Sequence, residues 1–205
     1  AYSALEWLEG LGMKFKDEIF TVLGALWPRS HKPEKPLGTG YIDTYMDYIN
    51  KHSNDIEIML NTRATELIVE NGRVVGVEAE NGPNTVIVRA NKGVIIATGG
   101  FSANVQARNY YNKIWPDLTN LKTTNRPGIT GDGIWMAEKI GANLIGMEQI
   151  QLLPMGEPET GSLSGNIEQG VENRIFVNKD GNRFVDEGAR RDVMTKALFK
   201  QKDSF

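Results

Sequence analysis

Apolar residues recur at helical spacing in two segments near the start of the chain. The leucines of residues 4–13 share one face of a predicted helix, and the apolar residues between 42 and 49 keep a 3.6-residue period that predicts a second helix. Between them, residues 14–40 hold several prolines and glycines and no periodic pattern, which is typical of irregular chain. The first fifty residues therefore predict two helices joined by a long irregular connection.

Short β signals follow the second helix. The alternation of apolar and polar positions in residues 55–60 is weak. The next three segments are separated by Asn71-Gly72 and by Asn81-Gly82-Pro83, which are both typical hairpin turns. This spacing predicts a three-stranded antiparallel meander, with strands at residues 65–69, 74–79 and 85–89.

A different kind of strand is predicted directly after the meander. Residues 93–100, Gly-Val-Ile-Ile-Ala-Thr-Gly-Gly, are apolar without alternation and end in small residues. A fully apolar strand is typical of a parallel sheet, in which both faces are buried. We expect this strand to end at a crevice where a ligand can approach the backbone closely.

The second half of the chain alternates helices with loops. We predict loop-like chain at residues 151–170, and a hairpin whose strands flank Lys179-Asp180-Gly181-Asn182. Helices are expected at residues 101–111, at 134–140 and from about 190 onward. Helices combined with a meander and a parallel strand predict a mixed α/β (α+β) fold.

Composition excludes several classes of site. The 205 residues contain no cysteine, so disulfides and thiolate-based zinc sites are ruled out. His31 and His52 lie far apart without metal-ligand spacing, and no metal is expected. The net charge of −3 gives no electrostatic basis for binding nucleic acid. No apolar run approaches the roughly 20 residues of a membrane span.

Two glycine-containing turns are candidate ligand sites. Thr98-Gly99-Gly100 ends the apolar strand, and Gly128-Ile129-Thr130-Gly131-Asp132-Gly133 precedes a predicted helix whose free N–H groups suit phosphates. Taken alone, each has an ordinary interpretation, because the glycine pair can simply turn the chain and Asp132 can cap the helix. The order of the two motifs after a meander is what favours a ligand. We expect the two turns to converge and leave a slot for a flat, extended cofactor.

The ordered motifs resemble the flavoprotein subunits of fumarate reductase and succinate dehydrogenase and their soluble single-chain relatives. The resemblance covers nearly the whole chain, and the ordered set is specific. It is carried by Asn61-Thr62-Arg63-Ala64, by Val94 to Phe101, by Thr124-Asn125-Arg126-Pro127-Gly128 with Thr130-Gly131-Asp132-Gly133, by Ile150-Gln151 with Pro154, by Val177 to Val185, and by Arg190-Arg191-Asp192.

The resemblance implies FAD as the cofactor and a division into two domains. Residues 1–150 would form part of an FAD-binding domain, and residues 151–205 would start a substrate-capping domain. By analogy, Ala64 offers its backbone to the adenine. The residues expected to approach the rest of the cofactor are Thr98, Gly99, Gly100, Gly131 and Asp132.

The resemblance also implies a reaction, the reduction of an enoate C=C bond. Hydride would come from flavin N5, and Arg191 would donate the proton to the other carbon. An arginine has a pKa above about 12, so a carboxylate relay must restore its proton. Glu168 is the preferred relay residue, with Glu187 and Asp192 as alternatives. The ordinary interpretation of Arg190-Arg191-Asp192 is a solvated helix start with a local ion pair.

One departure from the family pattern bears on the substrate. Fumarate and succinate enzymes carry His-Pro-Thr after the glutamine, whereas this chain has Leu152-Leu153-Pro154-Met155. Leu153 cannot hydrogen-bond a carboxylate, and burying an unpaired carboxylate is costly. A monocarboxylate with a larger, partly apolar tail is therefore expected in place of a dicarboxylate. The segment around Glu168 looks most like that of urocanate-reducing relatives.

Two alternatives remain open, a flavin dehydrogenase on the same scaffold, such as one acting on ketosteroids, and a non-catalytic α+β binding domain. The chain starts without Met and lacks a Gly-x-Gly-x-x-Gly fingerprint. We therefore expect an internal piece of a longer protein that binds FAD weakly and has no turnover alone. The electron donor and the compartment are left open.

Overall fold

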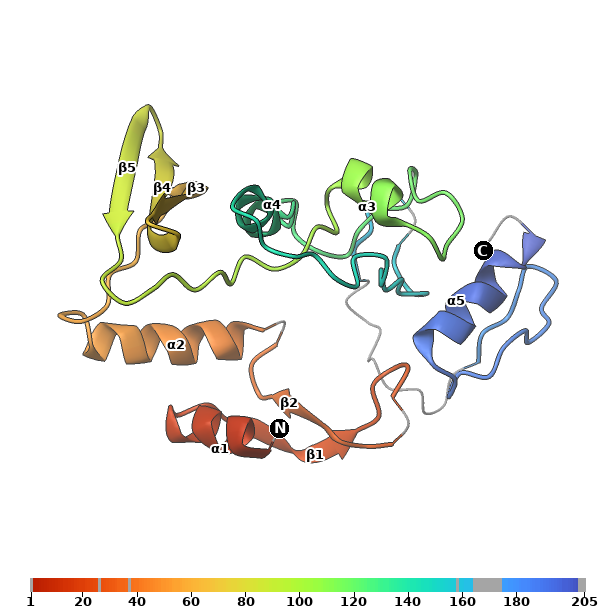
Figure 1. Cartoon of the computed structure of the whole chain (residues 1–205). Helices are drawn as coiled ribbons and strands as arrows, with labels where there is room; N and C mark the ends of the chain where they lie inside the picture. The colour runs from red at the N-terminus through yellow and green to blue at the C-terminus, as the bar shows by residue number, and fades with distance from the viewer. Residues whose placement is uncertain (1, 26, 37, 158, 164–174, 203–205) are drawn as a thin grey trace. The chain divides into compact units, whose positions relative to one another are not determined.

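The computed structural model describes residues 2–25, 27–36, 38–157, 159–163 and 175–202 (Figure 1). The chain divides into two compact units. The first unit comprises residues 1–58 and 167–205, and the second comprises residues 59–166. Among the described residues, no helix is both long enough and apolar enough to cross a membrane.

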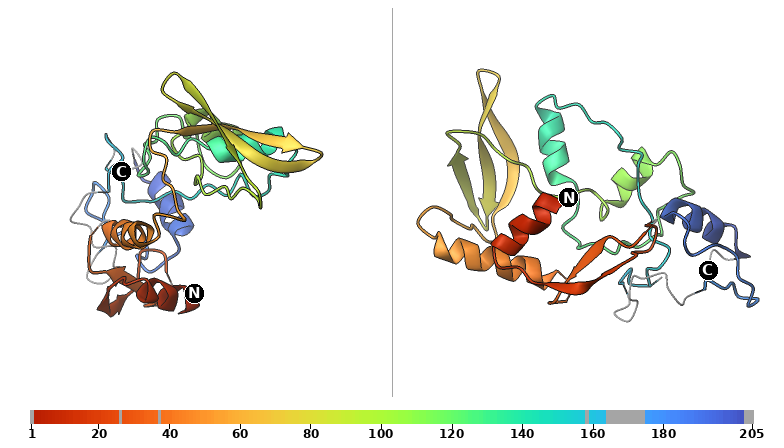
Figure 2. Two further views of the ribbon diagram at one scale, coloured as in Figure 1. Left: turned by 90° about the vertical axis from the view of Figure 1, so that its left-hand side faces the viewer. Right: turned by 90° about the horizontal axis from the view of Figure 1, so that it is seen from below.

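A three-stranded antiparallel sheet begins the second unit, as the turn sequences predict (Figures 1 and 2). Its strands follow one another in chain order: β3 (Arg63–Glu70), β4 (Arg73–Asn81) and β5 (Asn84–Arg89). Asn71 and Gly72 both have positive φ, 51° and 77°, which a two-residue hairpin loop of this twist requires. The predicted meander is therefore confirmed.

Two helices and a small core complete the second unit. Helix α3 (Val105–Tyr111) starts later than predicted because the side chain of Asn104 caps it, accepting a bond from the backbone N–H of Ala107. Helix α4 (Asp132–Lys139) packs against β3. The core is formed by Ala79, Ala107, Leu118, Met136 and Leu152.

Residues 93–100 form no strand among the described residues, contrary to the prediction. They run from β5 toward α3 without ladder partners, and the side chain of Ile95 is 92% exposed. A strand exists only through hydrogen bonds to neighbouring strands. No described strand pairs with this apolar segment, so its composition alone does not make it part of a sheet.

In the part of the first unit that the structure describes, there are three helices and a hairpin. Helix α1 (Tyr2–Gly10) precedes a two-stranded antiparallel sheet of β1 (Phe15–Phe20) and β2 (Ser30–Pro33), followed by α2 (Thr39–Lys51) and later by α5 (Arg191–Phe199). The prediction of irregular chain over 14–40 was therefore wrong for this hairpin. The buried apolar side chains of the first unit include Met13, Leu23 and Met194.

Two strand predictions, at residues 55–60 and around residues 179–182, were wrong or only partly right. Residues 55–60 form a turn and irregular chain, so the weak alternation there does not indicate a strand. The predicted hairpin around residues 179–182 is reduced to one bridge between Val177 and Arg183. The loop between them is closed by Asn178, whose side chain accepts bonds from the N–H groups of Asp180 and Asn182.

Candidate cofactor-binding site

The end of the apolar segment and the start of α4 meet in direct contact. A Cβ placed on Gly133 would overlap the side chains of Thr98 and Ile96, so only glycine permits this approach. On the neighbouring turn, a Cβ at Gly99 would lie 3.6 Å from Cδ1 of Ile129, an ordinary contact distance. The two turns therefore converge, but the side chains of Thr98 and Ile96 fill the space between them at this contact, so the slot expected for a cofactor is not found there.

Side-chain amides hold the loops around this contact. Asn104 Nδ2 donates to the carbonyl of Thr130 at 3.3 Å, and Asn125 Nδ2 donates to the hydroxyl of Ser102 at 2.9 Å. These bonds tie the segment after Gly100 to the loop that leads into α4. Both turns are therefore fixed relative to each other through polar groups as well as through packing.

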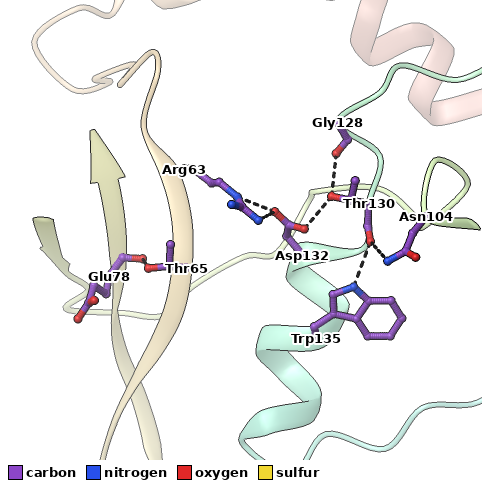
Figure 3. Close-up of polar contacts among 8 residues, drawn as sticks. All are labelled: Arg63, Thr65, Glu78, Asn104, Gly128, Thr130, Asp132 and Trp135. Atoms are coloured by element: carbon purple, nitrogen blue, oxygen red, sulfur yellow. Dashed lines mark hydrogen bonds and ion pairs between the residues drawn. The ribbon is translucent and has the colours of Figure 1, made fainter. Parts of the chain in front are cut away.

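Asp132 is the first residue of α4, and it links the helix to the sheet (Figure 3). One carboxylate oxygen accepts from the Thr130 hydroxyl at 2.7 Å, and the other accepts from Arg63 Nε at 3.0 Å and Nη2 at 2.9 Å. The Thr130 hydrogen bond, followed by Arg63, lowers the pKa of this carboxyl against the opposing effect of burial. Asp132 is therefore held as an anion.

The helix cap is Gly131, not Asp132. Gly131 has φ 91°, in the left-handed region, and no side chain bonds to the first turn as a cap. The first N–H groups of a helix have no partner within the helix and can bind a ligand's oxygens where they are accessible. Gly131 and Gly133 are buried here, and Asp132 between them is half-buried. Arg63 offsets the negative charge of Asp132, which would otherwise repel a phosphate at this position.

Open space lies beside the two turns. A Cβ on Gly100 or on Gly128 would have no atom within 4 Å, and both residues are exposed. Between Thr98 and Gly133 there is no room for a ligand. The exposed glycine backbone and the nearby guanidinium of Arg63 are groups that fit an extended ligand with phosphate groups, such as FAD.

Ala64 lies in β3 next to Arg63, the residue that bonds Asp132. Its backbone faces Ala79 of β4 in the register of the meander, and the ladder shifts between Ala64 and Glu66. Thr65, also at this shift, donates its hydroxyl to the carbonyl of Glu78 at 3.2 Å. The second unit thus contains all six predicted cofactor residues. Their contacts with the cofactor remain a prediction.

Arg191 belongs to the first unit and opens helix α5. Its Nε donates to the carbonyl of Leu23 at 2.8 Å, and its side chain is half-buried. The ion pair with Asp192 that the sequence suggests is made by Arg190, at 3.1 Å. Glu168, the predicted relay residue, lies outside the described residues.

Glu187, an alternative relay residue, is buried in a bonded pair. Its side chain is 6% exposed. The carboxylate accepts one hydrogen bond from Arg183 Nη2 at 2.6 Å and another from the N–H of Phe176 at 2.6 Å. Arg183 is the main cause that lowers the pKa of Glu187 to about 2. A carboxyl with this pKa is a poor proton carrier near neutral pH, so these contacts favour a structural role.

Sequence reasoning missed the partners that hold the site residues. In the sequence, Arg63 stands out only as part of the Asn-Thr-Arg-Ala motif, whereas its bond to Asp132 joins residues 69 positions apart. Thr130 stands out only as part of the glycine-containing motif. The carbonyl of Leu23 carries no side-chain signal at all, since any residue supplies one.

Comparison with known proteins shows which family the chain resembles. The family model described as an FAD binding domain matches residues 1–204. The chain is 43% identical to the NADH:acrylate oxidoreductase of Vibrio harveyi over 96% of this chain and 20% of that protein. It is 39% identical to the urocanate reductase of Eggerthella lenta, over 99% of this chain and 34% of that protein. The chain thus spans about a third or less of these curated relatives.

Solved structures agree with this grouping. The open conformation of a flavocytochrome c3 fumarate reductase matches with a TM-score of 0.74 and 31% identity, over 98% of this chain and 35% of that one. An Escherichia coli quinol fumarate reductase variant matches with a TM-score of 0.77 and 24% identity, over 96% of this chain and 35% of that one. The mixed α/β fold is therefore confirmed.

The contact at Gly133 generates a stability prediction. Gly133→Ala is expected to lower the free energy of unfolding by about 1–3 kcal/mol, because the new methyl group overlaps the stiff side chains of Thr98 and Ile96. Urea unfolding followed by tryptophan fluorescence measures this. Gly128→Ala is the matched control, since its methyl group meets open space. Equal stability of the two variants would contradict the contact.

The buried pair of Glu187 generates a pH prediction. Because the pKa of Glu187 is lowered to about 2, its stabilising effect is complete above about pH 4.5 and is lost as the pH falls toward 2. Glu187→Gln is expected to cost about 1–3 kcal/mol at pH 7 and progressively less on acidification. Urea unfolding at several pH values measures this, with the exposed Glu57→Gln as control. A pH-independent difference would contradict the pairing.

Proposed function

The chain belongs to the FAD-binding domain family, and on this premise we propose that the whole protein uses FAD to reduce the C=C bond of an enoate with a single carboxylate. Residues 1–150 would form part of the FAD-binding domain, and residues 151–205 would start a domain that caps the substrate. The observation that carries the proposal is the meeting of Thr98 with Gly133 beside exposed glycine backbone. An extended cofactor can lie along such backbone.

The cofactor would be held mainly by main-chain groups. The exposed backbone of Gly99 and Gly100 allows a flat group to come close, and the half-buried start of α4 at Asp132 would offer its N–H to a phosphate oxygen. Ala64 would present its backbone to the adenine, and Asp132 would stay near the cofactor's polar chain. FAD, when bound and reduced, supplies the hydride that the double bond receives.

The substrate class follows from two leucines and from the relatives. Leu152 is buried and Leu153 is half-buried at the position where the fumarate enzymes carry a histidine. An apolar residue there leaves a second carboxylate unpaired. The relative that shares 43% identity is named for acrylate, which has one carboxylate. Both observations favour a monocarboxylic enoate.

Arg191 would complete the reduction. The hydride adds to the β-carbon of the enoate, and the guanidinium of Arg191 gives a proton to the α-carbon, so that C=C becomes CH–CH. Positive charge beside the α-carbon stabilises the negative charge that develops there. Glu168 would return the proton to the arginine from solvent.

The role of the exposed glycine backbone has a direct test in the full-length protein. Gly100→Ala places a methyl group where the cofactor is expected to lie, so FAD affinity should fall about tenfold or more while the apoprotein keeps its stability. Gly93→Ala is the control, because its Cβ also meets no neighbour. FAD content is measured from flavin absorbance. Unchanged FAD content in Gly100→Ala would refute this placement.

The substrate class has its own test. Full-length holoenzyme supplied with electrons from a reduced dye should reduce acrylate and cinnamate-like acids with kcat/KM at least about tenfold above that for fumarate. The reason is that one unpaired buried carboxylate costs several kcal/mol. Oxidation of the dye is followed by absorbance, with urocanate included in the panel. Preferred turnover of fumarate would show that the inference from Leu153 is wrong.

A further inference from the structure

The side chain of Arg191 rests on a tight turn in the hairpin of the first unit. Its Nε donates to the carbonyl of Leu23 at 2.8 Å, although the two residues are 168 positions apart. A Cβ on Gly24 would lie 2.5 Å from Cγ of Arg191 and 3.2 Å from its backbone nitrogen. The arginine therefore touches the turn through both its polar and its apolar atoms.

The turn is short and is closed by a backbone hydrogen bond. It lies between β1 and β2, and the N–H of Ala25 donates to the carbonyl of Val22 at 2.8 Å. Leu23 is 5% exposed, so its side chain anchors the turn in the core of the unit. Gly24 has φ 85°, a conformation that residues with a Cβ rarely adopt.

We propose that the Leu23–Gly24 turn is the positioning element for the guanidinium of Arg191, a proposal that rests on the proton-donor role given above. A guanidinium is planar and rigid, so fixing Nε sets the plane in which both terminal nitrogens lie. The absent Cβ at Gly24 lets the arginine stem lie flat on the turn. Leu23 and Gly24 thus determine the position from which the guanidinium of Arg191 donates its proton.

The kind of acceptor suits this role. A carbonyl is neutral, and its hydrogen bond to a cation is weaker than the bond made by a carboxylate. The Leu23 carbonyl therefore orients the guanidinium while stabilising its charged form less than a carboxylate would. Arg183 shows the contrasting arrangement, because the buried carboxylate of Glu187 holds its guanidinium.

The chain offers a matched pair of variants for testing this positioning role. Gly24 and Gly12 both belong to the first unit and both have positive φ, 85° and 99°. An alanine at either position bears the same left-handed strain. Only at Gly24 does the new methyl group meet Arg191, since a Cβ on Gly12 has no neighbour within 4 Å. The difference between the variants isolates the contact from the strain.

The experiment uses the full-length holoenzyme with acrylate and a reduced dye. Gly24→Ala is expected to lower kcat about 10- to 100-fold, the loss caused by misplacing a reacting group by about 1 Å. KM and FAD content should stay within about twofold, and the solvent deuterium isotope effect on kcat should rise because proton transfer becomes slower. Gly12→Ala should keep the kcat and isotope effect of the unmodified enzyme.

Arg191→Ala separates this inference from the proposed function. It removes Cγ and the proton donor together, so kcat should fall at least about 100-fold and adding Gly24→Ala should cost nothing further. If Arg191→Ala keeps its activity, the proton-donor role fails. If Arg191→Ala is inactive while Gly24→Ala behaves as Gly12→Ala does, only the positioning role is overturned.

A second variant replaces Gly24→Ala if that protein does not fold. Arg191→Lys keeps the positive charge and the carbon stem but has no planar group that Leu23 can orient. It is expected to lose about 100-fold in kcat with KM unchanged. Full activity of Arg191→Lys would overturn the inference, because a fixed guanidinium plane would then be unnecessary.

Discussion

The backbone of Gly133 lies directly against the side chains of Thr98 and Ile96, and the arrangement of the candidate cofactor site depends on this approach. Any larger residue at position 133 would push the first turn of α4 away from the end of the apolar segment. The exposed backbone at Gly99 and Gly100 would then no longer lie beside the helix N-terminus. A missing side chain is therefore what allows two distant parts of the chain to lie in contact.

An ion pair also connects helix α4 to the sheet. Arg63 reaches from β3 to Asp132 on α4, with 68% of its own side chain exposed, so the pair contributes little to stability. Its effect is geometric and electrostatic. It fixes the start of α4 relative to the sheet, and it offsets the negative charge of a carboxylate at the N-terminus of that helix. The Thr130 hydroxyl keeps the same carboxylate in one orientation.

Arg183 and Arg191, both in the first unit, differ in the group that accepts their hydrogen bonds. Arg183 is paired with the buried carboxylate of Glu187, whose pKa of about 2 keeps both groups charged. Arg191 instead donates Nε to the neutral carbonyl of Leu23. The first arrangement suits a permanent structural tie. The second suits a cation that must be oriented without being locked in an ion pair.

Local sequence alone determined the meander, the helix of residues 42–49 and the ligand motifs, because turn residues and short-range periodicity act between neighbours in the chain. It missed β1, where charges at Lys16, Asp17 and Glu18 hide a hairpin that long-range pairing creates. It predicted a strand at residues 93–100 that finds no described partner.

Only the tertiary structure decided which groups meet: Arg63 with Asp132, Thr98 with Gly133, and Arg191 with Leu23. The sequence supplied the residue types, and with them the family and its cofactor, since those depend on ordered motifs. The partners are separated by up to 168 positions, and one of them is a backbone carbonyl that every residue possesses. Contacts of that kind leave no pattern in a sequence, because folding creates them by bringing distant segments together.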